Sequence, residues 1–229
     1  MAKLRNIILG TVAVVAVGAG LTYGWQQYRE KSIMDDSRTA QISSDSEVTS
    51  GPADKLLWGD THLHTANSID AFGFGVKLGP EDALRFARGE EVTSTGGLKA
   101  QLERPLDFLV IADHSDNMGF FPDMFAGKEH ILSDPTGQDW YDRVKRGEGV
   151  GVALELIGLF SQGEFPEALI YKPDSQPYKD AWAKTVAAAE EYNDPGKFTA
   201  FIGYEWTSLV RGNNMHRVVI YKDGGDKGG

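Results

Sequence analysis

The phrase His62-Leu63-His64 places two imidazoles two residues apart, where a strand is predicted to end. Side chains at positions i and i+2 of a strand point to the same face, so both rings can bind one metal ion through a neutral nitrogen. The alternative is a pair of loop histidines that only hydrogen-bond their neighbours. This phrase contains two of only five histidines in the chain, and the other candidate ligands along the chain favour the metal site over this alternative.

Further candidate ligands lie next to other apolar segments. Asp113-His114 directly follows the apolar run 108–112, and Glu205 follows the run that begins at Phe198. Loops at the carboxyl ends of strands in α/β barrels gather on one face, so these side chains are expected to converge.

His216 stands at the beginning of the last apolar segment, 218–221. If the last two strands form a hairpin, that beginning lies beside Glu205. The fifth histidine, His130, lies among charged residues and is predicted to be on the surface.

The elements that must position these side chains alternate along the chain. Apolar runs of strand length occupy 56–58, 108–112, 198–204 and 218–221, and helical spacing or helix-start signals occur at 79–89, 140–146, 152–160 and 180–192. The run 108–112 does not alternate with polar residues, as in a strand covered on both faces. The pattern favours an α/β architecture.

Charge and composition exclude several classes of protein. The chain has 33 acidic and 23 basic residues, a formal net charge of −10, which argues against a nucleic-acid partner bound through a basic face. It has no cysteine, so disulfides, thiolate metal sites and cysteine nucleophiles are excluded.

The amino-terminal segment indicates export. Lys3 and Arg5 precede residues 7–25, a run without charge that is long enough for a transmembrane anchor. A cleaved signal peptide is the alternative. Residues 29–55 are polar and predict a linker, and 56–229 predict the folded domain. We therefore expect a protein of the cell envelope, with its globular part outside the cytoplasm and the membrane as a partner of its first helix.

Six phrases in this order resemble the DUF3604 branch of the PHP family of metal-dependent phosphoesterases. They cover essentially the whole predicted domain and are Gly59-Asp60-Thr61-His62-Leu63-His64-Thr65, the segment from Gly79-Pro80-Glu81-Asp82-Ala83 through Arg88-Gly89-Glu90-Glu91, Arg104-Pro105-Leu106-Asp107-Phe108, Ala112-Asp113-His114, Gly203-Tyr204-Glu205-Trp206-Thr207-Ser208 and His216-Arg217. The resemblance implies a distorted barrel of about seven β/α units, preceded here by the amino-terminal helix, that holds two or three metal ions.

The resemblance also implies a ligand set. His62 and His64 match the ligands of one ion, and His114 matches a ligand of another. Glu205 matches the glutamate that bridges two ions, with His216 on the opposite side of the bridge. Asp70 falls near the place where many relatives carry another histidine, so it is either a metal ligand or a carboxylate that caps a turn.

The family's later ligands, among them an Asp-x-His pair, have no counterpart in this sequence. We therefore expect the chain to be the front part of a longer protein. The alternative is a short variant that completes its site from another subunit.

Imidazole with carboxylate suits Zn, Mn or Fe, and two or more such divalent ions can activate water against a phosphate ester. The predicted catalytic residues are Glu205, Asp113 and Arg217. Asp113 either orients a histidine ring or caps a turn, and Arg217 either binds a phosphate oxygen or forms a surface ion pair. The predicted function is a metal-dependent hydrolase acting on small phosphate esters. A non-catalytic metal-binding extracytoplasmic protein or inactive fragment, and a metallohydrolase for another bond, stay open.

Overall fold

The apolar run at 108–112 forms the middle strand of a three-stranded sheet in the computed structural model, which describes residues 55–228. β4 (Phe108–Ile111) pairs in parallel with β1 (Gly59–Leu63) on one side and with β5 (Thr199–Phe201) on the other. Most of β4 is buried, because both of its faces are covered. The prediction for this strand is confirmed.

The strand predicted at 56–58 is wrong. Leu56 is 69% exposed and Trp58 is 55% exposed, and β1 begins only at Gly59. β1 lies at the edge of its sheet, where it has one hydrogen-bonded neighbour within the described part of the chain. An apolar run does not become a buried strand unless another element covers it.

The single strand predicted at 198–204 is two strands in two sheets. β5 ends at Phe201, and β6 (Gly203–Ser208) begins a separate hairpin with β7 (Met215–Ile220). Gly203 permits the change of direction, since a Cβ there would lie 2.6 Å from Val110 Cγ1 and 2.7 Å from the Val219 carbonyl oxygen.

The predicted hairpin is confirmed, with an earlier start for its second strand. His216 therefore lies inside β7, paired with Thr207, instead of before it.

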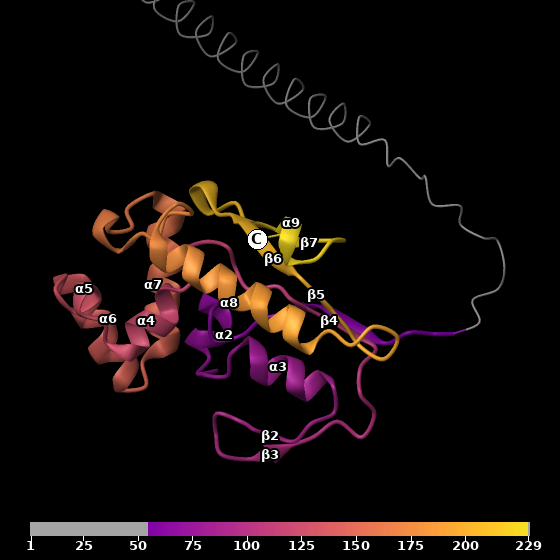
Figure 1. Ribbon diagram of the computed structural model, residues 1–229. Coiled ribbons are helices and arrows are strands. Elements are labelled where there is room, and N and C mark those ends of the chain that lie inside the picture. Colours follow the sequence, from indigo (N-terminus) through magenta and orange to yellow (C-terminus); the bar gives the residue numbers. More distant parts are fainter. Residues whose placement is uncertain (1–54, 229) are drawn as a thin grey trace, which may run out of the picture. The chain divides into compact units, whose positions relative to one another are not determined.

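Two helices pack against this sheet and bury its apolar side chains. α3 (Pro80–Ala87) begins after Gly79 with proline in its first turn, as predicted. α8 (Gln176–Tyr192) begins four residues before the predicted start at 180. Figure 1 shows the two helices beside β4 and β5, and their shared core contains Leu84, Leu109 and Val186 among others.

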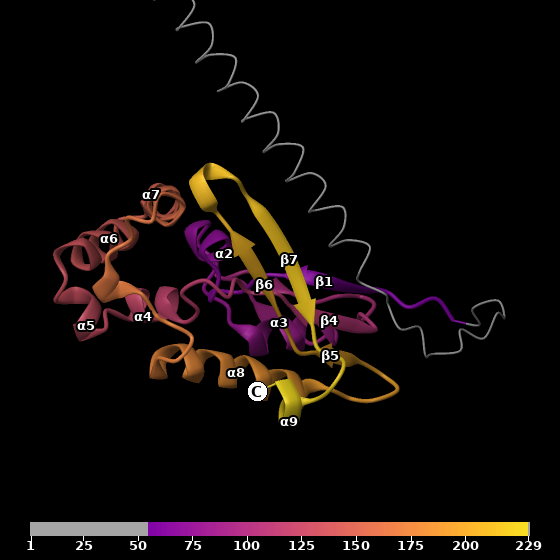
Figure 2. The same cartoon turned by 90° about the horizontal axis from the view of Figure 1, so that it is seen from above.

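Four further helices gather at the other end of the domain, away from the sheet (Figures 1 and 2). They are α4 (Phe120–Ala126), α5 (Glu129–Leu132), α6 (Pro135–Lys145) and α7 (Gly149–Gln162). They enclose a second core around Phe120, Trp140 and Leu156. The sequence predicted α6 and α7 with shorter bounds and missed α4 and α5.

The remaining helices, turns and strands of the described residues are short. They are α2 (Ile69–Gly73), β2 (Val92–Thr93), β3 (Lys99–Ala100), the 3-10 turns η1 (Glu167–Leu169) and η2 (Val210–Gly212), and α9 (Gly225–Gly228). Within residues 55–228 the strands form small separate sheets and no closed barrel. The architecture is mixed α/β.

The predicted anchor or signal at 7–25 and the predicted linker up to residue 54 lie outside the described residues. Among the helices of the described part, none combines the length and the apolar character that crossing a membrane requires.

Candidate metal centre

The carboxylate of Glu205 lies at the centre of a cluster of histidine rings. Glu205 stands in β6 and is 2% exposed. Its Oε2 is 3.2 Å from His62 Nε2, 3.2 Å from His64 Nε2 and 3.5 Å from His114 Nδ1, and its Oε1 is 3.0 Å from His216 Nδ1. The four histidines predicted to converge therefore meet at the glutamate predicted to join them.

His62 and His64 reach Glu205 from the carboxyl end of β1. Their ring centroids are 4.9 Å apart, and both rings lie on the side of β1 that faces Glu205, as the spacing predicted. His62 is half exposed and its backbone N–H donates to Asp60 Oδ1 at 2.8 Å. Asp60 therefore holds the backbone of the motif, which matches a capping role.

His114 is brought to Glu205 by the backbone that continues β4. The two residues form a parallel bridge, in which the Glu205 N–H donates to the Asp113 carbonyl at 3.0 Å and the Ser115 N–H donates to the Glu205 carbonyl at 2.8 Å. This bridge fixes His114, which follows β4, beside Glu205 in β6. This juxtaposition is the convergence that the sequence predicted.

Asp70 joins the cluster from α2. Its Oδ1 is 3.4 Å from His64 Nδ1 and its Oδ2 is 3.6 Å from His114 Nε2. Burial raises the pKa of Asp70, but the hydrogen bond with His114 and the neighbouring imidazole charges outweigh it and lower the pKa to about 2. Asp70 is therefore an ionised carboxylate placed between two rings, as a ligand would be. Its Oδ1 also accepts from the Ala71 N–H at 2.9 Å in the first turn of α2, so both predicted alternatives, metal ligand and turn cap, stay open.

The pKa values of the two deepest rings move in opposite directions. Burial lowers the pKa of His64, although Asp70 and Glu205 raise it. Burial also lowers the pKa of His114, but the hydrogen bond and charge of Asp70 and the charge of Glu205 outweigh it and raise the pKa. The lowered pKa of His64 favours its neutral imidazole, the form that binds a metal ion, whereas the raised pKa of His114 favours its protonated form.

The donor atoms form three overlapping groups, each with all its atoms within 4.8 Å of one another. They are His62, His64 and Glu205; His64, Asp70 and His114; and His114, Glu205 and His216. Nitrogen and oxygen ligands about 2.0–2.2 Å from a zinc ion lie roughly 3–3.5 Å from each other, which matches the separations around Glu205.

Hydrogen bonds alone do not account for this crowding. Three ring nitrogens approach Oε2 of Glu205, and one carboxylate oxygen offers about two lone pairs. The cluster therefore fits a cation between the rings and the carboxylate.

Three hydroxyl side chains outside the predicted ligand set hold the cluster in place. Ser68 Oγ lies 2.8 Å from His64 Nδ1 and accepts from the His114 N–H at 2.8 Å. Thr207 Oγ1 lies 2.7 Å from His114 Nδ1 and 3.2 Å from His216 Nδ1. Thr207 is two residues after Glu205, so the period of a strand was a signal for it.

Asp113 is hydrogen-bonded to the third of these hydroxyl residues, Thr65, and also to Ser68. It is buried and accepts from the Thr65 N–H and the Thr65 Oγ1–H, each at 2.6 Å. Burial raises the pKa of Asp113 despite these hydrogen bonds. Through Thr65 it holds the turn that follows His64, and through Ser68 it is linked to the His64 ring, so both predicted alternatives stay open.

Arg217 and His130 lie apart from the cluster. Arg217 follows His216 in β7, pairs with Trp206 across the hairpin and is exposed, so strand alternation turns it away from the face that carries His216. His130 is exposed, with Nε2 at 2.6 Å from Tyr171 Oη, which confirms its prediction as a surface residue.

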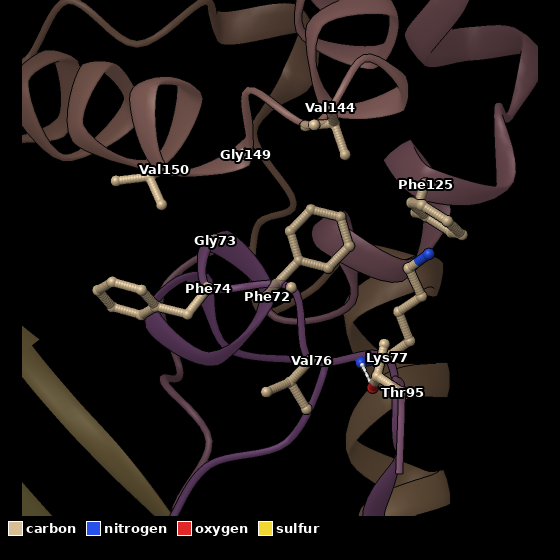
Figure 3. A pocket seen from close by; sticks show the side chains of 12 residues that line it. Phe72, Gly73, Phe74, Val76, Lys77, Thr95, Phe125, Val144, Gly149 and Val150 are labelled. Carbon is tan, nitrogen blue, oxygen red and sulfur yellow. Dashed lines mark hydrogen bonds between the residues drawn. The ribbon is translucent and has the colours of Figure 1, made fainter. Parts of the chain in front are cut away.

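Two hollows differ in their relation to the cluster. A cavity of about 270 Å³ is lined by Asp70, His114 and His216 on one side. Another, of about 340 Å³, lies between α2 and the turn that joins α6 to α7. Figure 3 shows Phe72, Val144 and Val150 around it, with Lys77 as its one charged lining residue. Only the first has chemical groups that suit catalysis.

The comparisons with known proteins give the family and nothing further. No curated protein and no solved structure matches the chain. A family model described as "Protein of unknown function (DUF3604)" matches residues 51–228. That match covers the whole cluster, from His62 to His216, and most of the chain, which therefore belongs to the DUF3604 family.

Proposed function

We propose that this protein is a metal-dependent hydrolase that cleaves phosphate esters with water. The observation that carries the proposal is the buried carboxylate of Glu205, which has four imidazoles within 3.5 Å. Imidazole and carboxylate together suit zinc, manganese or iron. In the reaction, water forms a new bond to phosphorus, the bond between phosphorus and the ester oxygen breaks, and one proton of the water passes to the oxygen of the released alcohol.

Different residues of the cluster would bind different ions. Oε2 of Glu205 faces His62 and His64, and Oε1 faces His216, so the carboxylate can bridge two ions. Asp70 can complete a third group with His64 and His114. Ions held there would supply Lewis acidity, which would make water more acidic and offset charge on a phosphoryl oxygen.

The chain's own groups keep the rings in position for that task. Ser68 and Thr207 each contact two members of the cluster through one hydroxyl oxygen, and each hydroxyl fixes the orientation of a ring. Asp113 fixes the turn after His64 through Thr65. Its role in this proposal is therefore positioning. Arg217, predicted either to bind a phosphate oxygen or to form a surface ion pair, is exposed and has no role in this proposal.

The proposal extends to the fold and the location. Three parallel strands, β1, β4 and β5, with ligands at the ends of β1 and β4, support part of a distorted barrel of the PHP type. The uncharged run 7–25 after Lys3 and Arg5 supports an anchor or signal that places this domain in the cell envelope.

The test is the hydrolysis of p-nitrophenyl phosphate by the full chain loaded with zinc or manganese. We expect Glu205→Gln to lower the rate by more than about 100-fold, because a bridging ligand matters more than an outer-shell residue. Glu191→Gln is the matched control, since Glu191 is exposed on α8. Elemental analysis of the same samples separates loss of turnover from loss of metal.

A wild-type chain that binds metal and hydrolyses no phosphate ester would favour the alternative of a non-catalytic metal-binding protein. Equal rates for the wild type and Glu205→Gln would contradict the role given to the glutamate.

A further inference from the structure

The cavity beside the cluster has a second wall of a different character. Asp70, His114 and His216 line it on the side of the cluster, and Ile157, Phe160 and Leu209 line it elsewhere. The apolar wall comes from α7 and from the residue that precedes η2. Figure 2 shows α7 close to both α2 and the tip of the β6–β7 hairpin, and both contacts are present in the structure.

Two of the apolar residues that line the cavity lie outside both hydrophobic cores. Ile157 and Leu209 are half-buried and belong to neither core cluster. Phe160, in contrast, stacks on Phe165 with ring centroids 4.1 Å apart. An apolar surface that faces a polar cluster and packs against no core is typical of a ligand site.

The charges around the cavity are negative. Among the described residues that line it, none is lysine or arginine, and two are the carboxylates Asp70 and Asp116. The nearby Arg211 lines a different hollow, of about 390 Å³, that shares Asp116, Phe160, Thr207 and Leu209 with this cavity. Apart from the proposed ion sites, the cavity therefore offers no lysine or arginine for a second negative charge on a ligand, and the carboxylate of Asp116 lies there instead.

We infer that this cavity binds the apolar substituent of a singly charged substrate, such as a phosphodiester or phosphonate monoester with one aromatic or branched aliphatic group. The inference rests on the proposed function and specifies its substrate class. A volume of about 270 Å³ is near the lower limit for ligand pockets, so one ring or a short chain fits.

Three compounds that water cannot cleave at phosphorus test the inference by isothermal titration of the metal-loaded full chain. Methyl(phenyl)phosphinate has one charge and a ring, dimethylphosphinate has one charge without a ring, and phenylphosphonate has a ring and two charges at mildly alkaline pH. We expect the first to bind at least about tenfold more tightly than the second, the factor for burying one ring. We also expect it to bind more tightly than the third.

The variant Ile157→Arg adds a cation to the apolar wall. We expect it to weaken methyl(phenyl)phosphinate binding by about tenfold and to strengthen phenylphosphonate binding, because the wall loses apolar surface and gains charge. Leu154→Arg is the control, since Leu154 is exposed on the same helix and does not line this cavity. The comparison of the three compounds uses the wild-type protein, so it tests the inference even if the variants do not fold.

Binding equal for the two phosphinates, or tightest for phenylphosphonate, would overturn the inference even if p-nitrophenyl phosphate is hydrolysed. Turnover of bis(p-nitrophenyl) phosphate is measured separately. No turnover of either ester, with the phosphinate preference intact, would overturn the proposed hydrolase and support the assigned ligand class.

Discussion

Two polar clusters in this protein contain similar side chains, and their hydrogen bonds are arranged differently. Around Asn117 each group has its own partner: the side-chain N–H donates to the Leu169 carbonyl at 3.2 Å, and the side-chain oxygen accepts from the Tyr171 N–H. The Tyr171 hydroxyl donates to Asp123 at 2.9 Å and lies 2.6 Å from His130. Around Glu205, three imidazoles crowd one oxygen.

The difference separates a structural network from a binding site. Groups that satisfy one another need nothing else, and such a network mainly stabilises the fold. A buried carboxylate oxygen approached by three ring nitrogens, more than its two lone pairs can use, is arranged for a cation. The two clusters should therefore respond in opposite ways to mutation and to metal.

The largest expected effect is on metal affinity. We predict that His64→Ala weakens binding of zinc to the full chain by more than about 100-fold, because His64 belongs to two of the three donor groups. His130→Ala, in the other cluster, should leave the affinity unchanged. Competition with a chelating dye measures the zinc affinity of both variants. An equal loss of affinity in the two variants would contradict the difference proposed between the clusters.

Removal of metal should lower the melting temperature. A ligand at about 100 times its Kd stabilises the folded state by about 2.7 kcal/mol, which for a domain of this size is roughly 5–10 °C. We expect this drop in calorimetry after chelation of the wild type and of Asn117→Ala, whose site is intact. A melting temperature that chelation leaves unchanged would contradict a metal ion bound to the folded state.

The Asn117 network should matter for stability alone. Asn117→Ala leaves the Leu169 carbonyl and the Tyr171 N–H without their partner, a cost of about 1–3 kcal/mol in the free energy of unfolding. Its backbone at φ 57° is also less favourable for alanine. Denaturant unfolding is expected to show this loss while zinc content per chain stays at the wild-type value. A loss of zinc in Asn117→Ala would contradict the separation of the structural network around Asn117 from the metal site.

The hydroxyl of Thr207 should affect metal affinity with little change in stability. Thr207→Val removes the oxygen between His114 and His216, so we expect zinc to bind about tenfold more weakly, as for other groups that orient ligands. Thr185→Val is the matched control, because Thr185 is buried and its hydroxyl donates only to the Ala181 carbonyl at 3.3 Å. Unaltered zinc affinity in Thr207→Val would show that the ring orientation does not depend on this hydroxyl.

The smallest expected effect concerns the carboxylate of Glu155 and its two hydrogen-bond donors, among the helices away from the sheet. Arg143 and Trp140 donate to Glu155 at 2.6 and 3.0 Å and lower the pKa of Glu155 below its ordinary value of 4.5. The stabilisation is therefore present above pH 4.5 and lost as pH falls through the lowered pKa. Because Glu155 is partly exposed, Glu155→Gln should cost less than about 1 kcal/mol.

Melting of metal-free wild type and Glu155→Gln across acidic pH measures this effect. The difference should shrink as the pH falls. A difference that grows on acidification would have the wrong sign.

The ligands of the cluster could be predicted from the sequence because their signals are local. The spacing of His62 and His64 and the place of His114 after an apolar run depend on strand geometry alone. The hairpin that carries Glu205 and His216 follows from two apolar runs separated by a turn.

Other features depend on contacts that the sequence does not state. The split between β5 and β6 depends on the close approach of Gly203 to Val110 and Val219. The helix α4 was missed because Gly119 and Gly127, with φ of 89° and 70°, bound it at both ends and look like loop residues in sequence. The exposure of Leu56 depends on what lies beside the edge of β1.

The most direct test of the central claim is the metal content of the full chain and of Glu205→Ala, purified without chelators, supplied with zinc and dialysed exhaustively. If the imidazoles and Glu205 share cations, elemental analysis will find at least one ion per chain in the wild type and markedly less in the variant. Wild-type protein free of metal, or equal metal in both, would contradict the account.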